Sequence, residues 1–310
     1  RGLGDVYKRQ VMFRAYYVGI TQTKILTVNS IVMLLSNVAL NYCLIFGKGG
    51  FPAAGIAGAA IASSVSEAVS LLFFIIYTSM TADKRKYGFR RAFTLRPHLL
   101  KGMLSISGWT MVQSFISVSI WFIFFLAIEH LGERPLAVTN IVRNISALLI
   151  MVISAFATTA GALISNQIGA GEQRCLFKTC GMTLKLTYAI LIPLLIILCL
   201  FPESVLRAFT DSPSLIAASV NSVYVMASST LIMAPSFILF NAVSGTGNTK
   251  AGFIMEMISL AVYTAVIYYG IIRLKPDVAL CWFSEHVYGV TLIFLAWWYL
   301  KSGKWRGKKV

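Results

Sequence analysis

The segment TCGMTLKLTYAILIPLLIILCLF, residues 179–201, contains a single charged residue, Lys185. An α-helix needs about 20 mostly apolar residues to cross the roughly 30 Å hydrocarbon core of a bilayer. Runs of this kind recur along the chain, which is 57% hydrophobic and 12% charged and has a mean hydropathy of +0.77. So many apolar runs could not all be packed inside one soluble core. The sequence therefore predicts an all-α protein that crosses the membrane several times.

Eight predicted spans account for most of the chain. Their boundaries, read from hydropathy and helix-breaking residues, are roughly 24–46, 54–80, 100–130, 136–168, 179–201, 215–243, 251–273 and 278–300. Residues 11–18 have the character of the end of a further helix whose body is missing. The first ten residues, RGLGDVYKRQ, do not fit the pattern of the rest of the chain. We interpret segment 1–10 as a non-native, adapter-like segment joined to a truncated reading frame.

The distribution of charge predicts the orientation of the spans. Basic residues are concentrated in a linker, 83–99, and in a tail, 302–310, with few acids to balance them. Because six predicted spans separate these segments, both lie on the same side of the membrane, and the positive-inside rule makes that side cytoplasmic. We therefore expect a multi-pass protein of the bacterial inner (plasma) membrane with a cytoplasmic C-terminus.

Several other classes of function are disfavoured by the sequence. The net charge of +16 is confined to short segments between apolar runs, and no nucleic-acid-binding motif accompanies it. The cysteines are scattered without metal-ligand spacing: Cys43, Cys175, Cys180, Cys199 and Cys281. The histidines are far apart and form no pattern typical of catalysis: His98, His130 and His286. We expect no enzyme activity, no metal, no cofactor and no nucleic-acid partner.

The first and last pairs of spans form an internal repeat. Gly19-Ile-Thr-Gln-Thr-Lys24 precedes the first span, and Gly245-Thr-Gly-Asn-Thr-Lys250 precedes the seventh. The dipeptides Ser66-Glu67 and Ser284-Glu285 then match loosely in the spans that come next. Six spans separate the two copies, so they share one orientation. Parallel repeats of this kind are typical of transporters in which the substrate binds between two lobes near the middle of the membrane.

Several stretches resemble the multidrug and toxic compound extrusion (MATE) family. In the first part of the chain they are RAYYVGITQTK (14–24), NVALNYCLIFG (37–47) and GIAGAAIA (55–62). In the second part they are SNQIGAGE (165–172), SGTGNTK (244–250) and YLKSGKW (299–305). Their order and spacing together are specific, and the resemblance covers essentially everything after residue 10.

The resemblance implies a twelve-helix exporter with a two-lobe helical bundle, of which this chain holds one complete six-helix lobe and the last two helices of the other. Residues 11–82 would be the end of helix four with helices five and six. A basic cytoplasmic linker, 83–99, would lead into helices seven to twelve, 100–301, and a basic tail, 302–310. The implied activity is secondary active export of amphiphilic, cationic drugs or metabolites in exchange for protons or sodium, by alternating access. The alternative is a lipid-linked oligosaccharide flippase of the same wider superfamily.

Polar residues inside the spans are the candidate site residues. A charged group at membrane depth costs on the order of 2.5–3.5 kcal/mol on insertion scales, so it usually faces the protein interior. The candidates for ion coupling, each able to accept a proton or pair with a cation, are Glu67, Glu285 and Glu256. The candidates for the substrate cavity are Asn37, Asn41, Gln113, Ser117, Asn140, Arg143 and Asn144. Helix packing explains Asn37 and Asn41 equally well, whereas Arg143 needs an acid or several carbonyls.

The resemblance also exposes a departure from the family. Many members carry acids on helices seven and ten, but here the predicted span 215–243 has none, and the coupling Asp of the first lobe would lie in the missing helices. We expect a monomer whose partners are a small amphiphilic substrate and the lipid bilayer. Three tryptophans are predicted to form an aromatic belt at the cytoplasmic interface: Trp297, Trp298 and Trp305.

Overall fold

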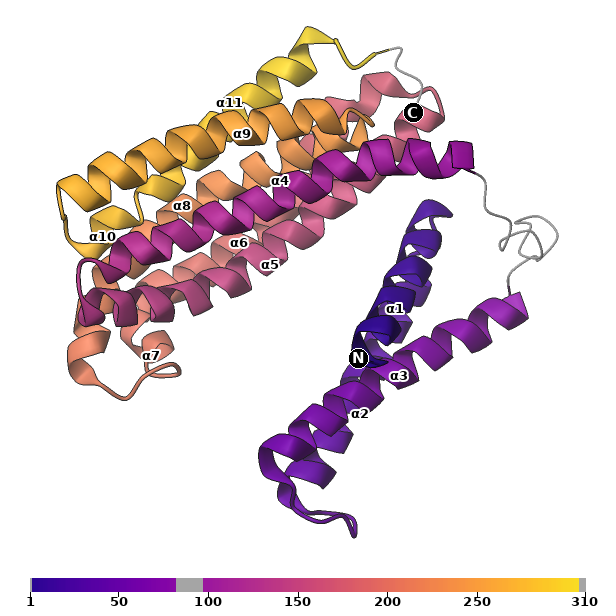
Figure 1. Ribbon diagram of the computed structural model, residues 1–310, viewed down its shortest axis with the longest axis horizontal. Coiled ribbons are helices and arrows are strands. Elements are labelled where there is room, and N and C mark those ends of the chain that lie inside the picture. The colour runs from indigo at the N-terminus through magenta and orange to yellow at the C-terminus, as the bar shows by residue number, and fades with distance from the viewer. Residues whose placement is uncertain (1, 82–96, 307–310) are drawn as a thin grey trace. The chain divides into compact units, whose positions relative to one another are not determined.

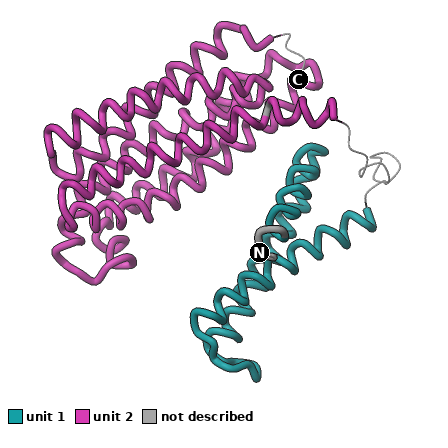
Figure 2. The backbone as a smooth tube through the Cα atoms, in the orientation of Figure 1, with its two compact units in different colours: residues 1–96 teal, residues 97–310 magenta. Residues whose placement is uncertain are grey.

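Two compact helical units make up the structure, Arg1–Arg96 and Pro97–Val310 (Figure 2). The computed structural model describes residues 2–81 and 97–306, and every regular element in these ranges is helical. The boundary between the units falls within the predicted linker, most of which, 83–96, lies outside the described residues together with the tail after Arg306.

Unit 1 contains three described helices, α1 (Gly2–Gly19), α2 (Lys24–Phe46) and α3 (Gly55–Thr81) (Figure 1). Helices α2 and α3 approach each other so closely that a Cβ atom on Gly58 would lie 2.4 Å from the carbonyl oxygen of Leu44. The buried amide of Asn29 on α2 donates a hydrogen bond of 2.8 Å to the hydroxyl of Ser70 on α3. Small and polar residues therefore hold these two spans together.

Helix α1 confirms the helix expected over residues 11–18 and extends it toward the N-terminus. The Gln10 side chain is 2% exposed, and its amide donates a 2.8 Å hydrogen bond to the backbone carbonyl of Glu67. Further along α1, the buried Tyr17 hydroxyl lies 2.8 Å from that of Thr78 on α3. Residues 2–10 thus continue the helix, and the foreign origin of segment 1–10 stays a prediction.

Unit 2 contains six long helices and several short elements in residues 97–306, and Figure 1 shows their arrangement. The long helices are α4 (Pro97–Glu129), α5 (Glu133–Gly169), α6 (Leu176–Leu200), α8 (Pro213–Gly245), α9 (Thr249–Val266) and α11 (Ser284–Ser302). The short elements are η2 (Gln173–Cys175), α7 (Pro202–Leu206), the π-helical turn η3 (Ile267–Arg273) and α10 (Val278–Cys281).

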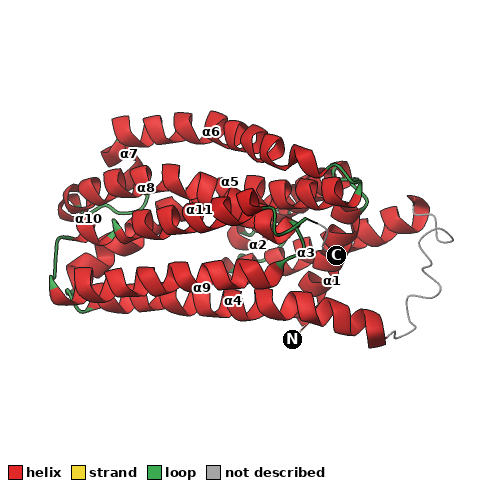
Figure 3. Cartoon of the chain, turned by 90° about the horizontal axis from the view of Figure 1, so that it is seen from above, coloured by secondary structure: helices red, strands yellow, loops and turns green. Residues whose placement is uncertain are grey.

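Five of the long helices of unit 2 form a closed ring. In order around the ring, α4 contacts α9, α9 contacts α11, α11 contacts α8, α8 contacts α5, and α5 contacts α4. Helix α6 packs outside this ring against α5 and α8, as Figure 3 also shows. Helices α5 and α8 approach each other closely, since a Cβ atom on Gly245 would lie 2.5 Å from the carbonyl oxygen of Gly161.

The eight predicted spans are confirmed. Eight helical segments in the described residues are long and apolar enough to cross a membrane, judged by length and composition. Their bounds are 24–46, 55–81, 97–129, 133–169, 173–200, 213–245, 249–273 and 278–302, within a few residues of those expected from the sequence except at the start of the fifth. The chain is therefore a multi-pass membrane protein.

The spans of unit 2 contain internal prolines, Pro193 in α6 and Pro235 in α8, and changes of helix type. Pro235 cannot donate to the carbonyl of Leu231, and the hydroxyl of Tyr188 on α6 supplies the missing donor at 2.8 Å. Helix α9 passes into the π-helical turn η3, and the last span is divided into α10 and α11 at Trp282 and Phe283. Hydropathy predicts the spans but not these divisions, because a break that keeps its backbone hydrogen bonds leaves the apolar pattern unchanged.

The two copies of the internal repeat fold into matching turns. Gly19 ends α1 and Lys24 begins α2, while Gly245 ends α8 and Thr249 begins α9. The third residue of each copy has a left-handed backbone: Thr21 has φ 61° and Gly247 has φ 77°. The repeat predicted from the sequence is thus a shared helix–turn–helix geometry.

Candidate functional site

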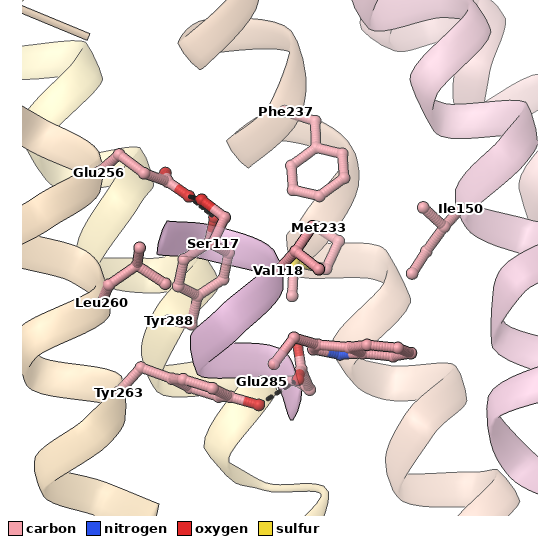
Figure 4. Close-up of a pocket in the computed structure, with 11 residues that line it drawn as sticks. Ser117, Val118, Ile150, Met233, Phe237, Glu256, Leu260, Tyr263, Glu285 and Tyr288 are labelled. Atoms are coloured by element: carbon pink, nitrogen blue, oxygen red, sulfur yellow. Dashed lines mark hydrogen bonds between the residues drawn. The ribbon is translucent and has the colours of Figure 1, made fainter. Parts of the chain in front are cut away.

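A cavity of about 240 Å³ lies inside the five-helix ring of unit 2, and each helix of the ring contributes to its wall (Figure 4). We call it the ring cavity. Its lining residues are Ser117, Val118 and Trp121 from α4, Ile150 from α5, Met233 and Phe237 from α8, Glu256, Leu260 and Tyr263 from α9, and Glu285 and Tyr288 from α11. Two carboxylates therefore lie in a wall that is otherwise mostly apolar and aromatic, with no lysine or arginine among the lining residues.

Glu256 is the more deeply buried of the two acids, at 4% exposed. Its Oε1 atom accepts a hydrogen bond from the Ser117 hydroxyl at 2.9 Å and another from the Tyr288 hydroxyl at 2.9 Å (Figure 4). Its Oε2 atom is buried and has no hydrogen-bond partner within the described part of the chain. A buried carboxylate without a basic partner is costly, so this oxygen is suited to a proton or to a bound cation.

The Ser117 hydroxyl has one proton and two acceptors. It lies 2.9 Å from Oε1 of Glu256 and 3.0 Å from the backbone carbonyl of Gln113, one turn earlier on α4. Only one of these acceptors can receive the proton at a time. When Glu256 is ionised, the hydroxyl is expected to donate to it. When Glu256 carries a proton on Oε1, it can donate to Ser117, which then donates to Gln113.

Glu285 is held differently. It is half-buried, its Oε1 atom accepts a 2.8 Å hydrogen bond from the hydroxyl of Tyr263 (Figure 4), and it lies in the first turn of α11. The division of the last span into α10 and α11 places this helix N-terminus beside the cavity. The first N–H groups of α11 donate to the preceding turn, from Glu285 to the carbonyl of Trp282 and from His286 to that of Phe283. The helix dipole still favours a negative charge there, by about 0.3–1 kcal/mol at exposed sites. Broken helices are a common way of building transporter binding sites.

The ring cavity is accessible beside α4. Val118 is 69% exposed and Trp121 is 40% exposed, whereas Tyr263 is 3% exposed at the inner end of the wall. Small-molecule pockets usually measure roughly 300–1,000 Å³, so a cavity of about 240 Å³ holds only the charged portion of a drug-sized compound. The rest of such a compound would lie against the exposed aromatic side chains of α4.

Three of the candidates from the sequence lie together in this cavity: Ser117, Glu256 and Glu285. Gln113 is half-buried and contributes its backbone carbonyl through Ser117. The two tyrosines that hold the acids, Tyr263 and Tyr288, were not among the candidates. Their sequence spacing could have indicated them. Tyr263 follows Glu256 by seven residues and Tyr288 follows Glu285 by three, so on each helix the tyrosine lies on the same face as the acid. Each tyrosine then bonds the acid of the other helix.

The polar stripe on α5 lies outside the lining of the ring cavity. Asn140 and Arg143 are half-buried and Asn144 is exposed. The Arg143 guanidinium lies over the ring of Phe125 on α4, 5.3 Å from its centroid, in place of the acid or carbonyls that the sequence led us to expect. Whether these three residues line a cavity for substrate stays a prediction.

The remaining candidates belong to unit 1. The amide of Asn41 donates to the Oδ1 atom of Asn37 at 2.8 Å, and the amide of Asn37 lies 3.5 Å from the Ser63 hydroxyl on α3. Glu67 is half-buried on α3, directly after the buried Ser66, just as Glu285 follows the buried Ser284. The local match between the two Ser-Glu pairs supports the repeat, and the role of Glu67 stays a prediction.

No group of three or more His, Cys, Asp or Glu side chains suited to a metal occurs among residues 2–81 and 97–306. The five cysteines are free thiols, two of them buried. The ring cavity is lined by two carboxylates, three hydroxyl groups and several aromatic rings. Carboxylates and aromatic faces are the groups that can pair with a lipophilic cation.

Comparisons with known proteins agree with this architecture. The family model MatE matches residues 110–269, just over half of the chain. The chain is 25% identical over 271 residues to the uncharacterized transporter YisQ of Bacillus subtilis, covering 84% of this chain and 57% of that protein. It is also 25% identical over 291 residues to a probable multidrug resistance protein, NorM, of Thermotoga maritima, covering 88% of this chain and 59% of that protein.

The fold also matches a solved structure. An outward-facing multidrug resistance MATE family transporter of the MOP superfamily aligns with a TM-score of 0.76 at 16% identity, covering 89% of this chain and 61% of that one. The chain thus spans about three-fifths of the length of the curated relatives it matches.

Proposed function

The chain belongs to the MatE family, and from this premise we propose that its protein is a secondary transporter that exports amphiphilic, cationic compounds in exchange for protons or sodium. The observation that carries the proposal is the ring cavity, where two carboxylates without a basic partner among the lining residues lie in an apolar and aromatic wall. The drug-resistance names of the relatives support export as the direction of transport.

The two acids have different roles in this proposal. Glu256 is the coupling carboxylate, because it is buried, is oriented by Ser117 and Tyr288, and keeps one oxygen free for a proton or ion. Glu285 contacts the cationic group of the substrate, because it is more accessible and is stabilised as an anion by the N-terminus of α11. Both lie in one cavity, so loading the coupling ion and binding the substrate influence each other.

Alternating access would come from rocking of two lobes, as the parallel repeat favours. The switchable hydrogen bond of Ser117 gives α4 two local states, one bonded to an ionised Glu256 on α9 and one bonded to a protonated Glu256. In the proposed orientation the C-terminus is cytoplasmic, in a bacterial inner membrane. Glu67 on α3 is retained as a candidate coupling acid in unit 1.

Dye accumulation tests the proposal. The complete gene is expressed in a bacterial host that lacks its main efflux pumps, and the accumulation of ethidium is followed by fluorescence. We expect lower accumulation in expressing cells, and restored accumulation after addition of a protonophore or removal of sodium, depending on the coupling ion. The variants E256Q and E285Q should accumulate dye like the empty host, whereas the exposed control E203Q should behave like the wild type. Unchanged accumulation across a broad panel of cationic dyes would contradict drug export.

A further inference from the structure

A second cavity of about 240 Å³ lies on the other side of α9, between this helix and α11. We call it the α9–α11 groove. Its lining residues are Ala251, Ile254, Met255 and Ile258 from α9, Leu295, Trp298, Tyr299 and Ser302 from α11, and Lys304. Helix α9 therefore presents two faces, with Glu256 in the ring cavity and Met255 in the groove. The transport mechanism proposed above uses only the first face.

The walls of the groove are apolar and accessible. Ile254 is 47% exposed, Ile258 is 44% exposed and Trp298 is 60% exposed. Both helices lie within predicted membrane spans, where lipid acyl chains are the expected neighbours of exposed apolar side chains. Residues 251–258 extend for about 10 Å along α9, so the groove can hold part of an acyl chain lying parallel to the helix.

One end of the groove is polar and positively charged. Lys304 lines it directly and is exposed. Tyr299 accepts a hydrogen bond from the side-chain amide of Asn248, which ties the start of α9 to the end of α11 at this point. Lys301 lies over the ring of Trp297 on its own helix and Lys250 over that of Trp109 on α4, and neither lysine lines the groove. No acid is among the lining residues, so the charge of this end is complementary to an anion.

Two tryptophans near the end of α11, Trp297 and Trp298, are exposed. Their place in an aromatic belt at the membrane interface stays a prediction. Trp305 differs, since it is 3% exposed and its Nε1 atom donates to the carbonyl of Leu300 at 2.8 Å, which helps to end α11. The groove lies at the C-terminal end of the last predicted span, and its cation, Lys304, follows that span directly, where the headgroups of a bilayer are expected.

We propose that the α9–α11 groove binds an anionic phospholipid, with an acyl chain between Ile254, Ile258 and Leu295 and the headgroup phosphate at Lys304. An apolar slot in the hydrocarbon region favours an acyl chain over a water-soluble ligand. A lysine at the interface favours an anionic headgroup over a zwitterionic one. This site does not depend on the proposed transport activity.

Native mass spectrometry of the purified chain in detergent tests the site. Phosphatidylglycerol and phosphatidylcholine with the same acyl chains are titrated in parallel, and bound lipid is counted. We expect one retained phosphatidylglycerol and little phosphatidylcholine. K304Q should weaken phosphatidylglycerol binding by about fivefold, the effect of one lysine near an anionic lipid. I254W, which fills the groove without changing charge, should weaken it as well.

The control is K178Q, which removes a charge at the start of α6 outside the groove and should bind phosphatidylglycerol like the wild type. Equal losses in K304Q and K178Q, with I254W unchanged, would show a general charge effect and overturn the site. Equal retention of phosphatidylcholine, or no retained lipid, would overturn it too. If I254W loses phosphatidylglycerol and K304Q retains it, Lys304 does not bind the headgroup, and the proposed contact with the phosphate is wrong.

Discussion

Glu256 illustrates how a few hydroxyl groups define the chemistry of the ring cavity. Its Oε1 atom is held from two neighbouring helices, by Ser117 on α4 and Tyr288 on α11, while its Oε2 atom has no hydrogen-bond partner among residues 2–81 and 97–306. Hydrogen bonds to a charged group contribute about 1.5–3 kcal/mol each. Two such bonds fix the carboxylate in one orientation before a cation or proton arrives, so little further ordering is needed on binding.

The first prediction concerns Ser117. We expect S117A to lower the affinity of the purified chain for tetraphenylphosphonium by about tenfold, since the loss of one charge-assisted hydrogen bond leaves Glu256 less well oriented. Isothermal titration calorimetry measures the affinity. The matched control is S119A on the same helix, because the Ser119 hydroxyl donates only to its own helix, at the carbonyl of Phe115. If S117A and S119A bind equally well, Ser117 does not orient Glu256.

The sequence predicts the acids of this site better than their partners. Glu256, Glu285 and Ser117 stand out as polar residues inside apolar runs. The partner of Glu256 on α4 is 139 residues away and the one on α11 is 32 residues away, so the pairing depends on helix packing that no local pattern encodes. Tyr263 and Tyr288 are also less conspicuous, because an aromatic residue in a span is more often a packing or lipid-facing residue.

At the scale of elements, the two turns of the internal repeat share a left-handed backbone at their third residue, but that residue differs between the copies. Thr21 occupies the left-handed position that Gly247 occupies in the second copy. A β-branched residue in this region stores about 1–3 kcal/mol of backbone strain, whereas glycine adopts it freely. The turn before α2 is therefore expected to be the less stable of the two.

The second prediction concerns this asymmetry between the turns. T21G should raise the thermal unfolding temperature of the detergent-purified chain, because it relieves strain of about 1 kcal/mol or more in the folded state. The reciprocal variant G247T should lower it. Scanning fluorimetry measures both. An unchanged or lowered unfolding temperature in T21G would mean that the Thr21 hydroxyl, which donates to the carbonyl of Ile20, outweighs the strain.

The third prediction concerns the contact between α5 and α8. A Cβ atom on Gly245 would lie 2.5 Å from the backbone oxygen of Gly161, so G245A has to separate the two helices and should destabilise unit 2 by about 1–3 kcal/mol. The control is G181A on α6, where a Cβ atom meets nothing within 4 Å. Alanine there should stabilise the helix by about 0.5–1 kcal/mol. Thermal unfolding that ranks G245A at or above G181A would contradict this packing.

The spans themselves are predictable because membrane helices repeat one strong signal, an apolar run of fixed length. All eight predicted spans are present. Their internal breaks at η3 and between α10 and α11 are not predictable in the same way, since they keep an apolar composition while changing the hydrogen-bond pattern. Those breaks matter for the site, because one of them places the N-terminus of α11 beside Glu285.

At the scale of the whole molecule, unit 2 is a closed ring of five helices around one cavity, with a sixth helix outside it. The cavity is lined by two carboxylates, which in the proposed mechanism bind the coupling ion and a lipophilic cation, and the α9–α11 groove lies on the other side of α9. The membrane class, the family and the repeat are all predictable from the sequence. The enclosure of Glu256 and Glu285 in one cavity is not, because residues on two helices could as well face opposite sides of the unit.

The central claim is that the ring cavity binds cationic compounds through these two acids, and calorimetric titration of the purified chain with tetraphenylphosphonium tests it most directly. We predict a single saturable site in the wild type and in the control E203Q, and no detectable binding in the double variant E256Q/E285Q when that variant keeps the wild-type unfolding temperature. Binding to a folded E256Q/E285Q with wild-type affinity would contradict the claim.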